Sequence, residues 1–345
     1  MRLLISGGGT GGHLYPALAV AQTCRAEDPG ATILLVGRRG GPEERIVPGA
    51  GFELETVAIQ GLNRDALLTN VALPVVLPAA LARGLSIVDS FKPDVVLGVG
   101  GYAMAPALFG ARLRRVPYVL HEQNVVPGLA TRLFAGGATV ICTTFPGTRV
   151  KGAVELTGLP LRSGFQLRTP SVPARSLLVT GGSQGAFKIN TTVWSCLDDL
   201  LVRYPEVTHL TGRQGAEDAK RHARPGYTAL AFTDDMADLF ARADLVVSRA
   251  GVGTLAELTA VGLPSVLIPG TFGGGHQEHN AGALVDAGAA LRLSDRELGP
   301  ETLLAALDSL DDERLRALAA ASAAMGRRDA AHSVLAVLRR VAANR

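Results

Sequence analysis

The chain has 345 residues, of which 47% are hydrophobic and 19% charged, and it contains 41 glycines. This composition is typical of a globular α/β protein with many tight turns and excludes a disordered or fibrous chain. The length exceeds what one hydrophobic core usually serves, so we expect two domains. The formal net charge of +3 is too small to indicate nucleic acid as the main partner.

Neither a targeting segment nor a membrane span is predicted. The apolar run of residues 3–5 is too short for a signal peptide. Residues 66–82 are strongly apolar, but Asn70 and two prolines interrupt them, and the run falls short of the roughly 20 residues of a spanning helix. The cysteines are odd in number, show no C-x-x-C spacing and lie in apolar stretches, which predicts small core residues in a reducing cytoplasm: Cys24, Cys142 and Cys196.

Strand-like apolar runs alternate with helical stretches along the whole chain. In the first half we expect strands at residues 3–6, 32–37, 95–99, 118–121 and 139–142. This alternation predicts parallel β-α-β units. The second half begins again in the same way, because Leu177–Gly182 repeats the pattern of Leu3–Gly8, and further strands are expected at residues 228–232, 245–248, 265–269 and 290–293. The predicted fold class is α/β, with two doubly wound, Rossmann-like domains.

Glycines and prolines between residues 158 and 173 are typical of a linker. We therefore expect a first domain over residues 1–160 and a second over 161–345, with a last helix that can pack back on the first domain. Ligands of open parallel sheets bind outside the carboxyl ends of the strands, so the two domains are expected to face each other across a cleft that holds the active site.

The first glycine motif, residues 7–13, leaves a strand and enters a helix whose first turn is expected to contain Pro16. Bare backbone at a helix N-terminus forms an anion seat. The motif also satisfies G-x-G-x-x-G, so a dinucleotide-dependent oxidoreductase competes. The second expected strand ends in Gly37-Arg38-Arg39, at the place where an enzyme that uses NAD has an acidic residue to bind the ribose. The arginines could instead bind the 2′-phosphate of NADP, so of the oxidoreductases only an NADP enzyme remains.

Several polar side chains are candidates for catalysis. His13 follows the glycines, and an imidazole with a pKa near neutrality can accept a proton from a sugar hydroxyl. The alternative is a capping or hydrogen-bonding histidine. A second group, His121-Glu122-Gln123-Asn124, follows an apolar strand at its carboxyl end, where binding residues belong. Loop polarity alone is the other interpretation of that group.

The second half repeats the strand, glycine turn and helix. Gly181–Ala186 offers Ser183 and backbone N–H groups to a pyrophosphate. Ser248–Glu257 ends in a carboxylate that can accept two hydrogen bonds from a ribose diol, or that merely complements the helix dipole. His276–Asn280 holds two histidines three residues apart around an acid, but no third ligand is evident and the chain contains no Asp-x-Asp pair, so no metal site is predicted.

These strings together resemble the MurG family of UDP-N-acetylglucosamine transferases. The motifs of residues 8–13, 92–102, 121–124, 182–186 and 234–236 occur in that family's order and span most of the chain. The resemblance implies a GT-B fold, with the acceptor lipid held by the first domain and UDP-GlcNAc mainly by the second. It implies inverting transfer of GlcNAc from UDP-GlcNAc to the 4-hydroxyl of MurNAc in undecaprenyl-pyrophosphoryl-MurNAc-pentapeptide, a step of peptidoglycan biosynthesis on which cell shape and division depend.

The resemblance also assigns residues. His13 is the candidate base, with Glu122 and His121 as rivals. Arg162 and Ser183 are implied at the phosphates, and the backbone around Phe232 and Thr233 at the uracil. The remaining donor contacts that it implies are Thr10, Gly11, Gly12 and Asn124 from the first domain, and Val252, Gly253, Thr254, Leu255, Ala256, Glu257, His276, Gln277 and Asn280 from the second. The chain departs from the family pattern at Gly158–Arg162, which lacks the usual Asn-Pro, and at the three glycines before His276. No cofactor and no metal is implied.

The lipid acceptor implies a cytoplasmic enzyme that is peripheral on the inner face of the cell membrane. Residues 71–81 are apolar and lie between Arg64 and Arg83, and further cations follow at Arg112, Arg114 and Arg115. They predict an apolar patch rimmed by cations that faces an anionic surface, unless the helix is buried and its arginines merely solvated.

Three rival functions remain. A related GT-B enzyme with another acceptor, or a UDP-GlcNAc 2-epimerase, would share the donor site. An NADP oxidoreductase leaves the second glycine loop and Glu257 without a role. The third is a catalytically idle UDP-sugar-binding or scaffold protein.

Overall fold

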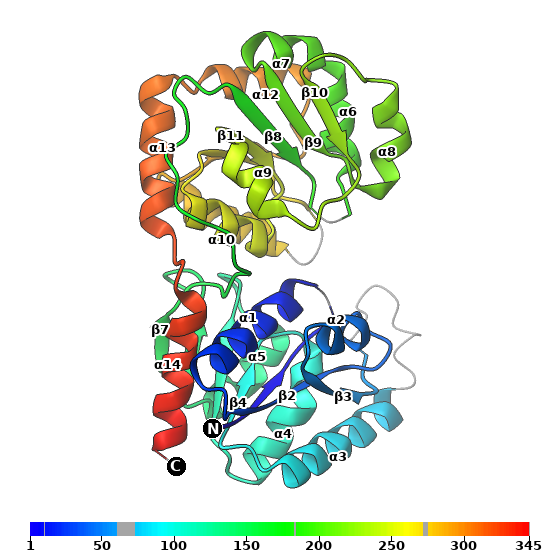
Figure 1. Ribbon diagram of the computed structural model, residues 1–345, viewed down its shortest axis with the longest axis vertical. Helices are drawn as coiled ribbons and strands as arrows, with labels where there is room; N and C mark the ends of the chain where they lie inside the picture. The colour runs from blue at the N-terminus through cyan, green and yellow to red at the C-terminus, as the bar shows by residue number, and fades with distance from the viewer. Residues whose placement is uncertain (10, 61–72, 183, 272–274, 345) are drawn as a thin grey trace. The chain divides into compact units, whose positions relative to one another are not determined.

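The structure is a computed structural model and describes residues 1–9, 11–60, 73–182, 184–271 and 275–344 (Figure 1). The chain forms two compact units, one of Met1–Arg162 with Asp329–Arg345 and one of Ser163–Arg328. The division follows Arg162, and residues 329–345, which were expected within the second domain with their last helix able to pack back on the first, are part of the first unit.

The first unit is built on a seven-stranded parallel sheet in the order β3-β2-β1-β4-β5-β6-β7. The order reverses between β1 and β4. At the carboxyl end of β1, Ser6 pairs with Val36 of β2 on one side and with Gly98 of β4 on the other. This is the switch point at which such sheets bind ligands. The strands are β1 Arg2–Ser6, β2 Thr32–Arg38, β3 Glu53–Val57, β4 Val95–Gly98, β5 Tyr118–Glu122, β6 Val140–Thr143 and β7 Val154–Leu156.

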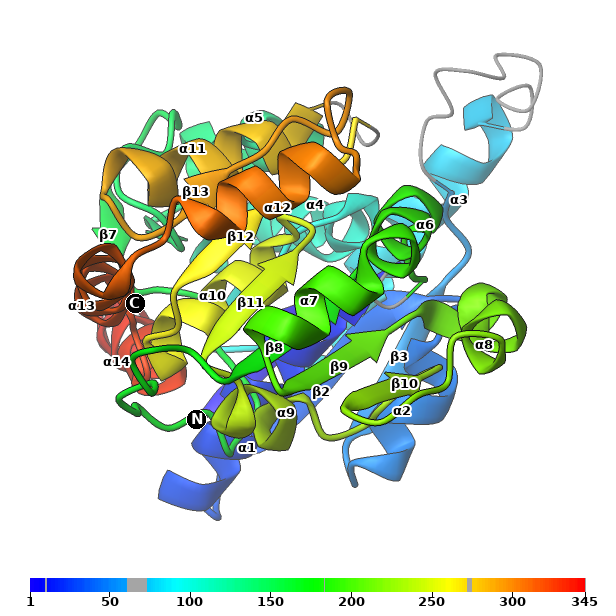
Figure 2. The same ribbon diagram turned by 90° about the horizontal axis from the view of Figure 1, so that it is seen from above.

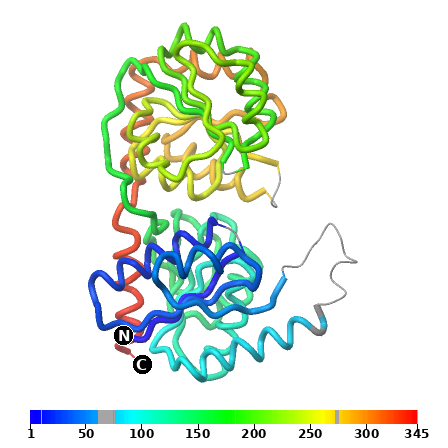
Figure 3. The backbone as a smooth tube through the Cα atoms, turned by 45° about the vertical axis from the view of Figure 1, so that its right-hand side comes forward, coloured from blue at the N-terminus to red at the C-terminus, as the bar shows by residue number. Residues whose placement is uncertain are grey.

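Helices cover both faces of this sheet, because successive side chains of a strand point to opposite sides. Leu3 and Ile5 of β1 pack into one apolar cluster with α1 and α14, whereas Leu4 packs into another with α3 and α4. Helix α14 runs beside α1 (Figures 1 and 3) and contributes Val334 and Leu338 to the first cluster. The helices are α1 Gly11–Glu27, α2 Glu43–Gly49, α3 Leu73–Phe91, α4 Ala105–Leu113, α5 Leu129–Phe134 and α14 Ala330–Ala343, with short 3-10 turns at Tyr102–Met104 and Ala135–Gly137.

The second unit repeats the arrangement with a six-stranded parallel sheet in the order β10-β9-β8-β11-β12-β13 (Figure 2). Its switch point lies between β8 and β11. The strands are β8 Ser176–Thr180, β9 Glu206–Leu210, β10 Tyr227–Leu230, β11 Leu245–Ser248, β12 Ser265–Leu267 and β13 Leu291–Arg292. The helices are α6 Phe187–Ser195, α7 Leu197–Arg203, α8 Gly212–Lys220, α9 Met236–Arg242, α10 Val252–Val261, α11 His276–Asp286, α12 Pro300–Asp308 and α13 Asp312–Met325.

The predicted α/β class with two parallel doubly wound sheets is confirmed. One local prediction is wrong: α1 begins at Gly11, so Pro16 is its sixth residue and lies inside the helix rather than in its first turn. The missing N–H leaves the carbonyl of Gly12 without its helical donor, and exposure of Gly12 lets water replace it. All three cysteines are buried and free, and none of the described helices combines the length and hydropathy that crossing a bilayer requires.

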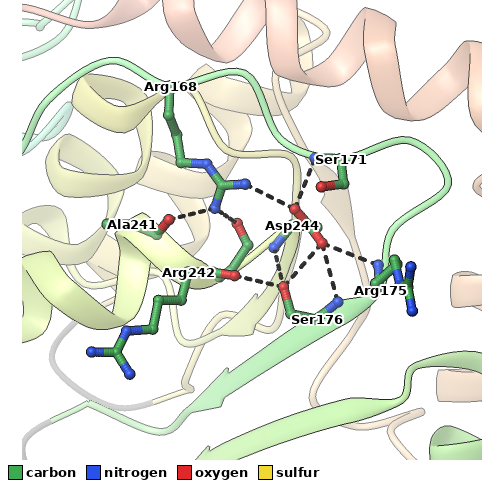
Figure 4. A network of polar contacts seen from close by, with 8 residues as sticks. Arg168, Ser171, Arg175, Ser176, Ala241, Arg242 and Asp244 are labelled. Atoms are coloured by element: carbon green, nitrogen blue, oxygen red, sulfur yellow. Dashed lines mark hydrogen bonds and ion pairs between the residues drawn. The ribbon is translucent and has the colours of Figure 1, made fainter.

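The chain enters the second unit through a segment that is tied to Asp244, the residue before β11 (Figure 4). Arg168 forms an ion pair with this carboxylate at 2.9 Å, and the backbone N–H groups of Ser171, Arg175 and Ser176 donate to it. Burial raises the pKa of Asp244, but these hydrogen bonds outweigh it and hold the pKa below its ordinary value. Asp244 thereby fixes the position of β8 beside β11.

Candidate active site

Two glycine loops interlock at the carboxyl ends of β1 and β4. Gly101 has a φ of +73°, and a Cβ there would lie 2.6 Å from the carbonyl oxygen of Gly8. Gly100 has a φ of +102°, and its Cβ would lie 2.6 Å from Cδ2 of His13. Only glycine allows this backbone conformation together with this close approach. The two loops and the His13 ring therefore form one packed unit.

His13, the third residue of α1, is partly buried against these glycines. Burial, together with the nearby ring of His121, lowers the pKa of His13 to about 4. The imidazole is consequently neutral at physiological pH and retains a nitrogen lone pair. A neutral imidazole at a strand-end loop is in the protonation state that a general base requires.

The two rival bases are engaged inside the protein. His121 is only 1% exposed, and its Nε2 donates to the carbonyl oxygen of Gly158 at 2.8 Å, while burial lowers its pKa to about 4. Glu122 is 4% exposed, and its carboxylate accepts the N–H groups of Asn124 at 2.9 Å and Gly128 at 3.2 Å. His121 is thus tied to the segment after β7 and Glu122 shapes the loop after β5, and because both side chains are buried, their low exposure favours His13 as the base.

Glu43 is a residue that sequence reasoning missed. It begins α2, is 1% exposed, and its Oε1 accepts the N–H of Gly9 at 2.5 Å. That N–H is therefore engaged by the Glu43 carboxyl group. The Gly9 N–H is thus not available to an anion, whereas the anion site expected at the start of α1 stays a prediction. No motif signals Glu43, because only the tertiary fold brings α2 to the loop.

The remaining first-domain candidates are placed as follows. Thr10 lies outside the described residues, and Gly11 and Gly12 form the first turn of α1. Asn124 is partly buried and has its backbone held by Glu122. Arg162, expected in the second domain, belongs to the first unit, where its guanidinium lies 4.7 Å from the ring centroid of Tyr15 on α1.

The second unit has an equivalent pair of interlocked glycine turns. A Cβ on Gly185 would lie 2.3 Å from the carbonyl oxygen of Thr211, and one on Gly212 would lie 2.5 Å from that of Gln184. Both glycines have positive φ, at +76° and +75°. Asn190 stabilises this contact, because its Nδ2 donates a hydrogen bond to the Thr211 carbonyl oxygen at 2.8 Å. Ser183, the expected phosphate ligand in this turn, lies outside the described residues.

Helix α10 follows β11 and begins after the extended Gly251. The N–H of Leu255 is bonded to the carbonyl oxygen of Gly251, which leaves the N–H groups of residues 252–254 as the ones without a helical acceptor. Leu255 and Ala256 bury their side chains in the core, so only their backbone can serve a ligand. Glu257, one turn further along, is partly buried. The helix N-terminus thus offers donors where the resemblance places the donor substrate.

Gln277 links two strand ends. Its Oε1 accepts the N–H groups of Ala250 at 3.2 Å and Gly270 at 2.8 Å, so its NH₂ group is the part that can donate to a ligand. His276 is partly buried, whereas Asn280 is 1% exposed. Phe232 is exposed beside Arg213, and the hydroxyl of Thr233 accepts the N–H of Asp235 at 3.0 Å.

The comparisons with known proteins agree on one family. Residues 3–143 match the glycosyltransferase family 28 N-terminal domain, and residues 176–334 match its C-terminal domain. The chain is 41% identical to the UDP-N-acetylglucosamine--N-acetylmuramyl-(pentapeptide) pyrophosphoryl-undecaprenol N-acetylglucosamine transferase of Syntrophotalea carbinolica, over 99% of both chains.

Solved structures also match the chain along nearly its whole length. The crystal structure of Acinetobacter baumannii MurG matches with a TM-score of 0.85 at 27% identity, over 98% of this chain and 99% of that one. A putative UDP-N-acetylglucosamine 2-epimerase from Listeria monocytogenes shares the fold alone, with a TM-score of 0.70 at 13% identity over 98% and 96% of the two chains. The chain therefore belongs to the MurG family of N-acetylglucosaminyltransferases, within glycosyltransferase family 28.

Proposed function

We propose that this enzyme transfers GlcNAc from UDP-GlcNAc to the 4-hydroxyl of MurNAc in undecaprenyl-pyrophosphoryl-MurNAc-pentapeptide, with inversion at the anomeric carbon. The observation that carries the proposal is membership of the MurG family along the whole chain, at 41% identity to a relative whose name states this donor and acceptor. The neutral His13 between two glycine loops supports it, because the reaction needs a base for a sugar hydroxyl.

The proposed mechanism is a single displacement. His13 accepts the proton of the MurNAc 4-hydroxyl while that oxygen forms a bond to C1 of GlcNAc. The bond from C1 to the diphosphate oxygen breaks at the same time, and UDP leaves with the bonding electrons. The N–H groups at the start of α10 and the guanidinium of Arg162 would offset the charge that develops on the diphosphate.

The remaining donor contacts are proposals of the same kind. Glu257 is assigned to the ribose hydroxyls, the NH₂ group of Gln277 and the amide of Asn280 to the GlcNAc hydroxyls, and the backbone at Phe232 and Thr233 to the uracil. Gln277 is the best supported of these, since its carbonyl oxygen is already held by two backbone N–H groups and its orientation is thereby set.

We also propose that the enzyme works on the inner face of the cell membrane. Helix α3 exposes Leu77, Pro78 and Ala79, and Leu113 at the end of α4 is likewise exposed. Of the expected rim, Arg83 and Arg114 are paired with Glu55 and Asp89, whereas Arg112 and Arg115 are exposed at the end of α4. Arg64 lies outside the described residues. Sedimentation with anionic and with neutral vesicles tests this proposal: binding to anionic vesicles that weakens with salt is expected, and equal binding to both would contradict it.

The reaction itself is tested by UDP release from UDP-GlcNAc in EDTA, with and without a short-chain analogue of the lipid-linked MurNAc-pentapeptide. We expect acceptor-dependent release and its loss in His13→Ala. His332→Ala is the matched control, because His332 is an exposed histidine of the same unit, on α14. Binding of UDP-GlcNAc without any acceptor-dependent turnover would leave the donor site standing and refute the assignment of this acceptor.

A further inference from the structure

A buried carboxylate lies against the first glycine loop. Oε1 of Glu43 accepts the N–H of Gly9, and Oε2 is equally buried and has no hydrogen-bond partner in the described part of the chain. A buried charge costs free energy unless it is paired, and no ion pair of Glu43 with Lys, Arg or His occurs among the described residues. A polar atom left in this state calls for an explanation.

The glycines around Glu43 show that the contact is built into two loops. A Cβ on Gly8 would lie 1.8 Å from Oε1, and a Cβ on Gly41 would lie 1.9 Å from Oε2. Neither position has room for a side chain while Glu43 occupies this space. The carboxylate is therefore enclosed by the loop after β1 and the loop after β2, and it holds the two together.

The same loop contacts connect Glu43 to the proposed base. The Gly8 carbonyl oxygen packs against Gly101, and the backbone of Gly100 and Gly101 packs against the His13 ring. A shift of residues 7–9 would therefore move the surface on which the imidazole rests. Close packing transmits such a shift, because there is no free volume to absorb it.

We propose that Glu43 is a positioning residue for the transfer reaction. Its carboxylate holds residues 7–9 in place and so orients His13, without touching either substrate. The ionised acceptor makes a stronger hydrogen bond to the Gly9 N–H than a neutral one would. This inference rests on the proposed function of His13 as the base.

The kinetic test compares Glu43→Ala and Glu43→Gln with Glu44→Gln. Glu44 is the next residue of the same helix, is exposed, and accepts the N–H of Gly40 at 2.9 Å, so it is a matched control. Misplacement of a catalytic group lowers the rate without weakening ground-state binding. We expect kcat to fall on the order of 10²-fold in Glu43→Ala, with KM for UDP-GlcNAc changed by less than about threefold. Glu43→Gln keeps an acceptor oxygen, so its kcat should be about tenfold higher than that of Glu43→Ala. The kcat of Glu44→Gln should equal that of the wild type.

A second readout does not depend on activity. Hydrogen exchange of the Gly9 amide and the imidazole ¹³C–¹H signals of His13 are measured in the full-length variants. Faster exchange and shifted His13 signals in Glu43→Ala, but not in Glu44→Gln, are expected. Unchanged His13 signals or an unchanged kcat in a folded Glu43→Ala would overturn the proposal.

Two further outcomes are also decisive. If Glu43→Ala does not fold, Glu43→Gln decides the question, since wild-type kcat and wild-type Gly9 exchange in that variant would overturn it. If the wild type shows no transfer, the proposed function falls, and the catalytic role of Glu43 with it. Gly9 exchange in the variants would then separately decide whether the carboxylate holds the loop.

Discussion

Asp244→Ala should be among the most destabilising single changes in the second unit. The carboxylate is 4% exposed and accepts hydrogen bonds from three backbone N–H groups, from the hydroxyl of Ser176 at 3.0 Å and from the guanidinium of Arg168 (Figure 4). Truncation leaves three backbone N–H groups and Nη2 of Arg168 without their acceptor in a place that water reaches poorly, while Nη1 of Arg168 keeps the carbonyl oxygens of Ala241 and Ala243. Breaking a buried ion pair costs about 3–5 kcal/mol. We expect the unfolding free energy of Asp244→Ala to fall by this amount and not by the sum of the individual hydrogen bonds, because water partly hydrates the exposed donors.

The assay is urea unfolding followed by fluorescence of Trp194, the single tryptophan of the chain, which lies in the second unit. The midpoint should fall while the slope m stays constant. Asp238→Ala is the control, because Asp238 forms an exposed ion pair with Arg242 at i,i+4, worth about 0.3–0.5 kcal/mol. A loss below about 1 kcal/mol in Asp244→Ala would refute the reasoning.

The pH dependence of unfolding gives an independent check that the ionised Asp244 carboxylate stabilises the folded state. Because the folded pKa of Asp244 lies below the unfolded value, the unfolded state binds more protons in the window between the two. The stabilisation is therefore complete above the unfolded pKa of about 3.9 and is lost as the pH falls through the folded pKa. The difference between wild type and Asp244→Ala should shrink on acidification below about pH 4, and a difference that grew would contradict the assignment.

Three further predictions concern other parts of the chain. If His13 is the base, kcat/KM for UDP release should fall on the acid side near its pKa of about 4, whereas an acid limb near pH 6.5 would point to another group. Burial raises the pKa of Cys142 to about 12, so a thiol reagent should label none of the three buried cysteines until urea unfolds the chain, and rapid labelling of the native protein would contradict this. Gly212→Ala should cost about 2 kcal/mol or more, because its Cβ would meet the Gln184 carbonyl oxygen and its φ is positive. Gly282→Ala, inside α11 with open space around its Cβ, should instead be neutral or stabilising by about 1 kcal/mol in the same Trp194 assay, and equal losses in the two variants would show that the clash is not the cause.

Much of the fold could be read from the residues because strands buried on both faces are continuous apolar runs. The sequence-based strands at residues 3–6 and 245–248 coincide with β1 and β11 to within one residue. Three strands escaped this reasoning. Edge strand β3 reads Glu-Leu-Glu-Thr-Val, β7 is a three-residue edge strand, and β9 carries His209 in its interior. That histidine is tolerated because Tyr227 and Asn190 satisfy both ring nitrogens, and these partners are distant in sequence.

The sequence by itself determined the parallel α/β class and the glycine loops at the strand ends, since each depends on local spacing, and it offered His13 as a candidate base. Only the tertiary structure decided how the polar residues near these loops are used. It buried His121 against the segment after β7 and Glu122 against the loop after β5, and it brought Glu43 of α2 into contact with Gly9. The physical reason is that burial and hydrogen-bond partners come from segments far apart in the chain, and no local pattern of residues records them.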